Sequence, residues 1–354
     1  MAAPKPIVIQ VIDSLFRGGA QKVVVDIVAA LPHCRHVVCY WTNETDLKPE
    51  LEALGATLVR IPFYGMWSFP ITWIKFNWLM RHYKPQILHS HMFVPNLLTR
   101  TLLRKKFKSV ATYHGECLEG TSLKASVTRW LEKRLLHRSD QLIAVSNYIK
   151  TYLQAKLKTT QPIEVIHNYG RVGAPASLQP YLPLRMVATA NNHVYKNYPM
   201  LLQAMHELRN QPVTLEIYGQ RMEQLKVQAR EMELHNVQFH DPVADVTAVF
   251  SAYNVFIIGS KGAEGFSLAL LEAMNSGLPV ICSNIEQFNE AVAGQAISFD
   301  PVNVSDLVHQ IKKLIRHPEQ LESLSAASRQ RAQLFSKPIF VKRIGAVYGK
   351  PADS

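Results

Sequence analysis

Short runs rich in valine and isoleucine recur along the chain, and segments with helical periodicity lie between many of them. In the first half these runs are predicted strands, at residues 7–12, 35–40, 57–61, 87–89, 109–113, 141–145 and 163–166. They do not alternate strictly between apolar and polar residues, which is typical of strands buried on both faces of a parallel sheet. The alternation of strands and helices therefore predicts an open α/β sheet with helices on both faces.

The same pattern stops and begins again in the second half. Residues 170–183 contain two glycines and three prolines without periodicity, and a linker is predicted within this stretch. Further strands are predicted at 186–190, 213–218, 237–240, 255–258 and 280–283. A chain of 354 residues is long enough for two domains. We therefore expect an α/β protein of two Rossmann-like domains facing across a cleft, with limits at 1–172 for the N-terminal domain, 173–183 for the linker and 184–337 for the C-terminal domain.

Cysteine spacing and hydropathy exclude several classes of protein. No CxxC pair or metal-ligand spacing occurs, so neither a disulfide framework nor a zinc site is expected from the four cysteines, Cys34, Cys39, Cys117 and Cys282. The longest apolar stretch, residues 66–80, is interrupted by polar residues and is too short to span a bilayer. No signal-peptide pattern precedes the first predicted strand. We expect a cytoplasmic protein.

The charge of the chain is concentrated in its first half. Residues 1–180 carry 23 lysines and arginines against 11 acidic residues, a net charge of +12, whereas residues 181–354 carry 16 of each. This asymmetry predicts an anionic partner for the first half. Segments 66–78, 100–108 and 124–138 mix basic and aromatic residues, which favours the inner face of an anionic membrane. The alternative for the charge is a solvated basic surface kept for solubility. The alternative for segment 66–78 is an ordinary core in which Trp73 and Phe76 pack inward. No nucleic-acid-binding signature occurs, so nucleic acid is not an expected partner.

Two loops are predicted to bind an anion. Gly18 and Gly19 lie between the first predicted strand and the first predicted helix, where a glycine turn lets a ligand approach the backbone and the helix N-terminus. The G-x-G-x-x-G pattern is absent, so a nicotinamide dinucleotide is not expected. Lys196 follows the first strand of the second domain, where it can pair with phosphate. The alternatives are a structural turn and a surface lysine.

A third segment, residues 260–274, joins a predicted strand to a predicted helix through a glycine-containing loop. The N–H groups of Phe266, Ser267 and Leu268 lie at the start of this helix and can receive a phosphate. Glu272 is flanked by apolar residues, so its carboxylate needs a hydrogen-bonding partner, for which a ribose diol is suited. The alternative is that Glu264 caps the helix and that Glu272 is solvated.

The stretch from Glu264 to Ile281 resembles the E-x7-E signature of retaining glycosyltransferases of family 4, which have the GT-B fold. Further matches occur in the same order as in that family, at residues 17–21, 112–115, 145–147 and 165–168. The resemblance implies that a helix at about 338–350 packs back on the first domain. It also implies roles for individual residues: Glu272 for the ribose, Glu264 for the transferred sugar, Lys196 with the amides of Phe266, Ser267 and Leu268 for the diphosphate, Gly19 for the far wall of that site, and His114 for the reaction centre.

One departure from the family concerns the diphosphate. The family has an arginine five positions before the lysine, and this chain has Asn191 there. A charge-assisted hydrogen bond contributes roughly 1.5–3 kcal/mol, so the substitution bears directly on diphosphate affinity. Arg221 is a candidate replacement.

The resemblance implies a retaining glycosyltransferase that moves a hexosyl-type sugar from a UDP- or GDP-sugar to a glycan or lipid-linked acceptor, in cell-surface polysaccharide or glycolipid synthesis such as that of lipopolysaccharide. No Asp-x-Asp occurs, so no metal and no other cofactor is expected. Two alternatives stay open: a nucleotide-sugar 2-epimerase of the same architecture, and a non-catalytic glycosyltransferase-like scaffold.

Overall fold

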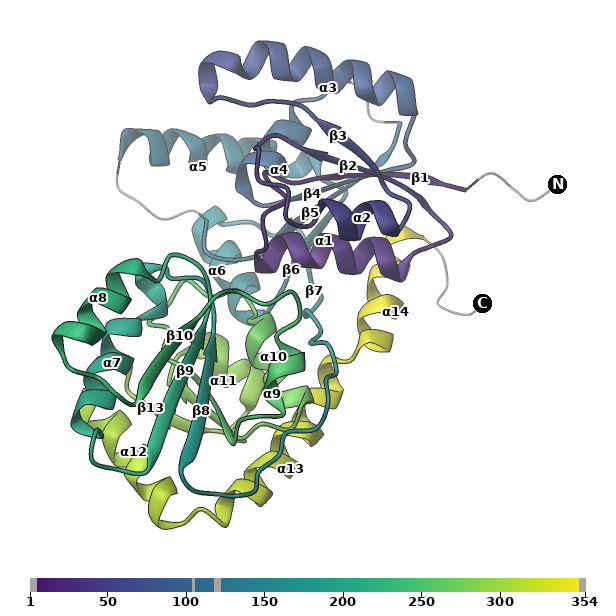
Figure 1. Ribbon diagram of the computed structural model, residues 1–354. Helices are drawn as coiled ribbons and strands as arrows, with labels where there is room; N and C mark the ends of the chain where they lie inside the picture. The colour runs from purple at the N-terminus through teal and green to yellow at the C-terminus, as the bar shows by residue number, and fades with distance from the viewer. Residues whose placement is uncertain (1–4, 104–105, 118–121, 350–354) are drawn as a thin grey trace. The chain divides into compact units, whose positions relative to one another are not determined.

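A computed structural model describes residues 5–103, 106–117 and 122–349 of the chain (Figure 1). The chain divides into two compact units. The first contains the described residues up to His167 together with those from Phe340 onward, and the second runs from Asn168 to Ile339. Arg104 and Lys105, which belong to one of the predicted basic segments, lie outside the described residues.

The first unit is built on a parallel sheet of seven strands in the order β3-β2-β1-β4-β5-β6-β7. The strands are β1 (Ile7–Val11), β2 (Arg35–Tyr40), β3 (Thr57–Arg60), β4 (Ile87–His91), β5 (Lys108–Tyr113), β6 (Gln141–Ala144) and β7 (Ile163–Val165). The strand order reverses between β1 and β4. The helices are α1 (Gly19–Ala30), α2 (Lys48–Ala53), α3 (Phe69–Tyr83), α4 (Phe93–Arg100), α5 (Leu123–Leu135) and α6 (Asn147–Leu157).

Both faces of this sheet are covered by helices, as the valine-rich strands predict. Successive residues of β2 point to opposite faces, so that Val37 joins one apolar cluster and Val38 the other. Helices α3 and α4 complete the first cluster with Phe76 and Leu98, and α1 and α2 complete the second. The predicted doubly covered parallel sheet is confirmed.

The last helix, α14 (Lys337–Tyr348), ends in the first unit. The side chain of Lys108 donates a hydrogen bond to the carbonyl of Val347 at 2.5 Å, and Arg343 pairs with Glu164 at 3.9 Å. The hydroxyl of Tyr348 reaches residues of β1 and β4. These contacts attach the end of α14 to both the centre and the edge of the sheet.

The second unit has a parallel sheet of six strands in the order β10-β9-β8-β11-β12-β13. The strands are β8 (Leu184–Thr189), β9 (Val213–Tyr218), β10 (Val237–His240), β11 (Val255–Ile258), β12 (Val280–Ser283) and β13 (Ile297–Phe299). The helices are α7 (Tyr198–Glu207), α8 (Glu223–Glu231), α9 (Thr247–Phe250), α10 (Leu268–Asn275), α11 (Glu286–Val292), α12 (Val304–Arg316) and α13 (Gln320–Ala332). The order reverses between β8 and β11. The predicted second α/β domain is confirmed.

The segment predicted as a linker is hydrogen-bonded along the second unit. The N–H groups of Ala176 and Ser177 donate to the carbonyls of Ser276 and Ser251, at 2.8 and 3.2 Å. The amide of Asn254 donates to two further carbonyls of the segment. The segment therefore runs over the surface of the second unit as an ordered strap without secondary structure.

Candidate functional site

Open parallel sheets bind ligands at the carboxyl ends of their strands, where the strand order reverses. Lys196 follows β8 and Glu264 follows β11, the two strands at the reversal in the second unit. Gly19 follows β1, and His114 follows β5, which lies next to β4 in the first unit. A recess opens at this edge of the second sheet, and its lining residues are Ala188, Thr189, Ala190, Lys196, Tyr198, Leu201, Ile257, Ile258 and Gly259.

Lys196 and Glu264 form a largely buried ion pair. The Nζ atom of Lys196 lies 2.6 Å from Oε1 of Glu264, and the two side chains are 12% and 8% exposed. The hydroxyl of Ser260 is fully buried and donates to the same oxygen at 2.6 Å. The N–H of Lys261 donates to the carbonyl of Tyr195 at 2.8 Å, which joins the two loops. The lysine that the sequence predicts for the diphosphate and the glutamate that it predicts for the transferred sugar are thus in direct contact.

Helix α10 begins at Leu268, so the three amides predicted to bind the diphosphate, those of Phe266, Ser267 and Leu268, occupy different positions relative to the start of the helix. Ser267 is the N-cap, and its side chain accepts a hydrogen bond from the N–H of Leu270 at 3.4 Å. The N–H of Leu268 belongs to the first turn, where the helix dipole favours an anion. Phe266 precedes the helix, its ring packs on Phe335 at 5.0 Å between centroids, and its carbonyl accepts from Asn168 at 2.9 Å. Phe266 therefore anchors the start of α10.

Glu272 lies half-buried on α10, one helical turn after Leu268. The backbone of this turn packs against Gly170, because a Cβ atom at that position would lie 2.5 Å from the nitrogen of Glu272. The amide of Asn275 donates to the carbonyl of Gly170 at 2.8 Å. Only glycine allows the chain to pass this close to the helix.

Asn191, which occupies the position of the expected arginine, has a role in the loop itself. Its Oδ1 atom accepts a hydrogen bond from the N–H of Gln220 at 3.0 Å, and this links the loops after β8 and β9. Burial lowers the pKa of His193, and the positive charges of Arg221 and Lys196 lower it further. Arg221 is therefore close enough to act electrostatically on the loop that carries Lys196.

The glycine turn of the first unit has one crowded and one open position. Gly18 is the N-cap of α1, and a Cβ atom there would lie 2.6 Å from the ring of Phe16 and from Oε1 of Gln21. At Gly19, the first residue of the helix, a Cβ atom would meet no described atom within 4 Å, its chain neighbours and the backbone of its own helix aside. Gly18 is thus crowded by two side chains, whereas Gly19 leaves space beside the helix N-terminus.

His114 is the end of a chain of hydrogen bonds in the first unit. Its Nε2 atom lies 3.1 Å from Nδ1 of His91, whose Nε2 lies 2.8 Å from Oε1 of Gln10. Burial lowers the pKa values of His89 and His114 to about 3 and that of His91 well below its usual range, so all three rings are neutral at pH 7. Among the described residues, the buried Nδ1 atom of His114 has no hydrogen-bond partner.

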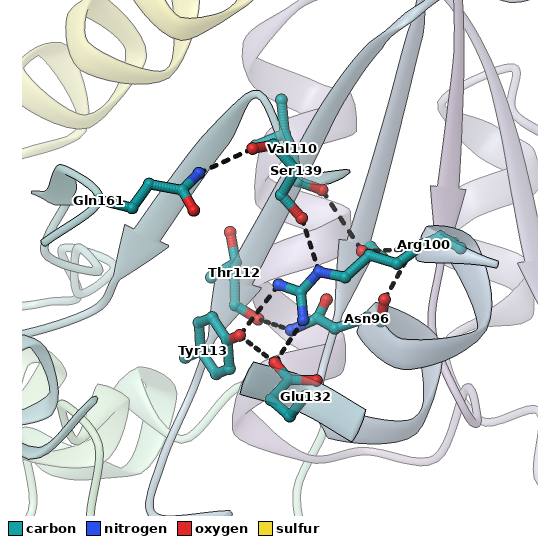
Figure 2. A network of polar contacts seen from close by, with 10 residues as sticks. Asn96, Arg100, Val110, Thr112, Tyr113, Glu132, Ser139 and Gln161 are labelled. Atoms are coloured by element: carbon teal, nitrogen blue, oxygen red, sulfur yellow. Dashed lines mark hydrogen bonds and ion pairs between the residues drawn. The ribbon is translucent and has the colours of Figure 1, made fainter. Parts of the chain in front are cut away.

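The residue before His114 belongs to a buried polar network, shown in Figure 2. The guanidinium of Arg100, on α4, donates to the hydroxyl of Ser139 at 2.7 Å, to that of Tyr113 at 3.0 Å and to the carboxylate of Glu132. The Tyr113 hydroxyl also donates to Glu132, which lies on α5. The carboxylate and tyrosine raise the pKa of Arg100 despite its burial. The network joins α4 and α5 to the carboxyl end of β5, where His114 begins its loop.

Sequence reasoning missed five residues that the structure adds to these sites: Ser260, Gln10, His89, His91 and Tyr348. The two histidines alternate with apolar or small residues on β4, which was a usable signal for one polar face of a buried strand. Gln10 and Tyr348 depend on a contact between distant segments, whereas Ser260 lies only four positions from Glu264, and no pattern marked its role. In the described part of the chain, no helix has the length and hydropathy to cross a bilayer, and no cluster of three metal-binding side chains occurs.

Comparison with known proteins gives matches over both units. Residues 17–169 match the model of Glycosyltransferase Family 4, and residues 184–331 match that of the Glycosyl transferases group 1. An uncharacterized glycosyltransferase of Methanocaldococcus jannaschii is 23% identical over 286 residues, which are 75% of this chain and 76% of that protein. The O-antigen chain mannosyltransferase B of Escherichia coli is 25% identical over 289 residues, 73% of each chain. The crystal structure of Anabaena HepE in complex with UDP and glucose is similar in fold, with a TM-score of 0.82 and 17% identity over 96% of this chain and 98% of that one.

Proposed function

We propose, from the premise that this chain belongs to the family 4-type glycosyltransferases with the GT-B fold, that it transfers a hexosyl-type sugar from a UDP- or GDP-sugar to a glycan or lipid-linked acceptor. The observation that carries the proposal is the Lys196–Glu264 ion pair at the strand reversal of the second unit, beside the N-terminus of α10. It combines a cation for a diphosphate with a carboxylate for sugar hydroxyls.

In this proposal the diphosphate binds Lys196 and the amides at the start of α10. Arg221 is proposed to supply the second positive charge that Asn191 lacks, because its charge acts on His193, in the loop that carries Lys196. The carbonyl of Arg221 also accepts a hydrogen bond from the side chain of Asn192 in that loop, at 3.0 Å. Gly19 is the proposed contact of the first unit with the diphosphate. Cations and helix amides stabilise the leaving diphosphate directly, so the proposed reaction needs no divalent metal.

The ion pair changes partners when the donor binds. Lys196 turns from Glu264 toward the diphosphate, and the carboxylate of Glu264, still held by Ser260, accepts hydrogen bonds from the sugar hydroxyls. Glu272 accepts from the ribose hydroxyls, and His114 contacts the sugar near the reacting carbon. The free protein thus keeps both charges compensated until the substrate replaces the pair.

The proposed chemistry retains the anomeric configuration. The bond between the anomeric carbon and the diphosphate oxygen breaks on the same face on which the acceptor oxygen forms its bond to that carbon. The proton of the acceptor hydroxyl passes to the departing diphosphate oxygen, so that no protein nucleophile is needed. Lys196 and the first turn of α10 stabilise the charge that develops on the leaving group.

The acceptor is proposed to be a cell-surface polysaccharide or glycolipid precursor, as in lipopolysaccharide synthesis. The Escherichia coli relative is named as an O-antigen chain mannosyltransferase, and it covers nearly three quarters of this chain. A precursor on a lipid carrier lies in a membrane, which we propose that the enzyme reaches from the cytoplasmic side.

A hydrophobic stripe on α3 supports peripheral binding to an anionic inner membrane face. Ile71, Ile74 and Trp78 are 58%, 61% and 62% exposed, and their spacing puts them on one side of α3. Trp67, just before the helix, is 74% exposed. On the opposite side of the helix Phe76 is buried. The indole N–H of Trp73 donates a hydrogen bond to the carbonyl of Thr101 at 3.2 Å. Exposed tryptophan and isoleucine on a basic domain suit the boundary between lipid headgroups and acyl chains.

Liposome flotation tests the membrane part of the proposal. Wild-type protein is expected to float with vesicles that contain anionic lipid, and added salt is expected to weaken this binding. The double substitution Ile74→Ser and Trp78→Ser is expected to abolish flotation. Val227→Ser replaces a half-exposed apolar side chain of α8 in the second unit and is the matched control. Binding that is the same for all three proteins contradicts the role of α3.

A donor screen tests the catalytic proposal. Thermal stability and sugar release are measured with UDP-, GDP-, ADP- and CMP-sugars, with and without EDTA. Stabilisation by one nucleotide series is expected, lost in Glu272→Ala and kept in Glu231→Ala, which changes an exposed glutamate of α8. Conversion of donor without acceptor to its C2 epimer identifies the 2-epimerase. Absence of binding across the panel favours the scaffold, and loss of activity with EDTA contradicts metal independence.

A further inference from the structure

The end of helix α14 completes a hydrogen-bond chain inside the first unit. The hydroxyl of Tyr348 lies 2.8 Å from Nε2 of Gln10, on β1, and 2.7 Å from Nδ1 of His89, on β4. Nε2 of His89 lies 2.7 Å from the hydroxyl of Thr112, on β5. Since Gln10 also contacts His91, which contacts His114, a continuous chain connects α14 to the proposed reaction centre.

The donors and acceptors of this chain can be assigned in sequence. Burial raises the pKa of Tyr348, so its hydroxyl keeps one proton. The NH₂ group of Gln10 donates to that hydroxyl, and the hydroxyl donates to Nδ1 of His89. The carbonyl oxygen of Gln10 therefore faces His91 and accepts from an N–H at its Nε2. Nδ1 of His91 is then a lone pair, which accepts from an N–H at Nε2 of His114.

The opposite direction of the chain leaves a different atom at its end. If the amide of Gln10 were reversed, each bond would reverse with it, and Nδ1 of His114 would carry a proton. Among the described residues that nitrogen is buried without a partner. A buried N–H without an acceptor is rarer in proteins than a buried acceptor without a donor, because each such donor loses a full hydrogen bond. This asymmetry favours the direction in which Nδ1 is a lone pair.

We propose that Tyr348 is a positioning residue that fixes His114 with its proton on Nε2, so that Nδ1 is free to accept a hydrogen bond from a hydroxyl of the substrate. Tyr348 does so because its hydroxyl has a single proton, which couples the orientation of the Gln10 amide to the proton position of His89. The identity of the hydroxyl as one of the donor or acceptor sugar rests on the proposed function. The protonation of His114 does not, since it is a property of the free protein.

Nitrogen NMR of the full chain with isotope-labelled histidine tests the inference without any substrate. The His114 signals are assigned by their loss in His114→Gln. The wild-type protein is expected to show one neutral form of His114, protonated on Nε2. In Tyr348→Phe the amide of Gln10 loses the hydroxyl that couples it to His89, and a mixture of both neutral forms of His114 is expected. Tyr83→Phe, at the end of α3 where the ring contacts His82 and Arg35, is the matched control and is expected to leave the single form unchanged.

Kinetics separate a positioning role from a merely structural one. Tyr348→Phe is expected to lower kcat about tenfold, the effect of one misdirected hydrogen bond, while KM for the donor changes little. The inference is overturned if wild-type His114 is protonated on Nδ1, a result that does not depend on the folding of any variant. It is also overturned if Tyr348→Phe keeps the single wild-type form. If the NMR result is as expected but no nucleotide sugar binds, the proposed function fails and the assignment of His114 stands.

Discussion

Removing the negative charge of Glu132 is expected to destabilise the first unit strongly. Glu132 and Arg100 are both fully buried as side chains, and the guanidinium has three described partners, of which only the carboxylate is charged. Glu132→Gln keeps the shape of the side chain but leaves the Arg100 charge in the interior without a counter-ion. Breaking a buried pair from one side costs about 3–5 kcal/mol, so we expect a loss of this size in the free energy of unfolding.

Tryptophan fluorescence provides the assay, because all five tryptophans lie in the first unit, at positions 41, 67, 73, 78 and 130. Unfolding in urea followed by this signal therefore reports on that unit. Glu52→Gln is the control, since Glu52 pairs with Lys48 at 3.7 Å with both side chains about half exposed. Such a surface pair contributes at most about 0.5 kcal/mol. A loss of unfolding free energy in Glu132→Gln no larger than in Glu52→Gln contradicts a buried, charge-compensated pair.

Three further results are expected. Lys196→Ala is expected to lower kcat/KM for the nucleotide sugar about ten- to hundredfold, because a charge-assisted contact is lost. Lys313→Ala, at an exposed position of α12, is expected to leave kcat/KM unchanged. Equal effects of the two substitutions in steady-state kinetics contradict the phosphate-binding role of Lys196. Acid is expected to destabilise the first unit, because burial lowers the pKa values of His89 and His114 to about 3, so the unfolded chain binds more protons than the folded chain between about pH 6.5 and 3. Stability should be complete above pH 6.5 and fall by up to about 1.4 kcal/mol per histidine and pH unit below it, and urea midpoints that are equal at pH 7 and pH 5 contradict this. Gly170→Ala is expected to lower the melting temperature of the second unit, because the added Cβ atom would lie 2.5 Å from the backbone of α10. A calorimetric transition at the wild-type temperature contradicts this and shows that the segment around Gly170 moves away from the helix.

The arrangement of strands and helices was predictable because its signals are local. Runs such as 35–40, 213–218, 237–240, 255–258 and 280–283 coincide with strands at the same residues. The parallel sheet follows from strands that are apolar on both faces and alternate with helices. Strand β13 was missed because it has only three residues, too few to show a clear period.

The sequence by itself determined the order of the strands along the chain and the loops in which Gly19, His114, Lys196 and Glu264 lie, because hydrophobic periodicity and motif spacing depend on neighbours within a few residues. Tertiary structure alone decided what those side chains touch. Lys196 and Glu264 are in contact although they lie 68 positions apart in the sequence, and Tyr348 and His89 are in contact although they lie 259 positions apart. Such contacts depend on where the sheet order reverses and where the last helix returns. The protonation of His114 and the pairing of the donor-site charges are therefore properties of the folded chain, set by burial and by partners that no local pattern identifies.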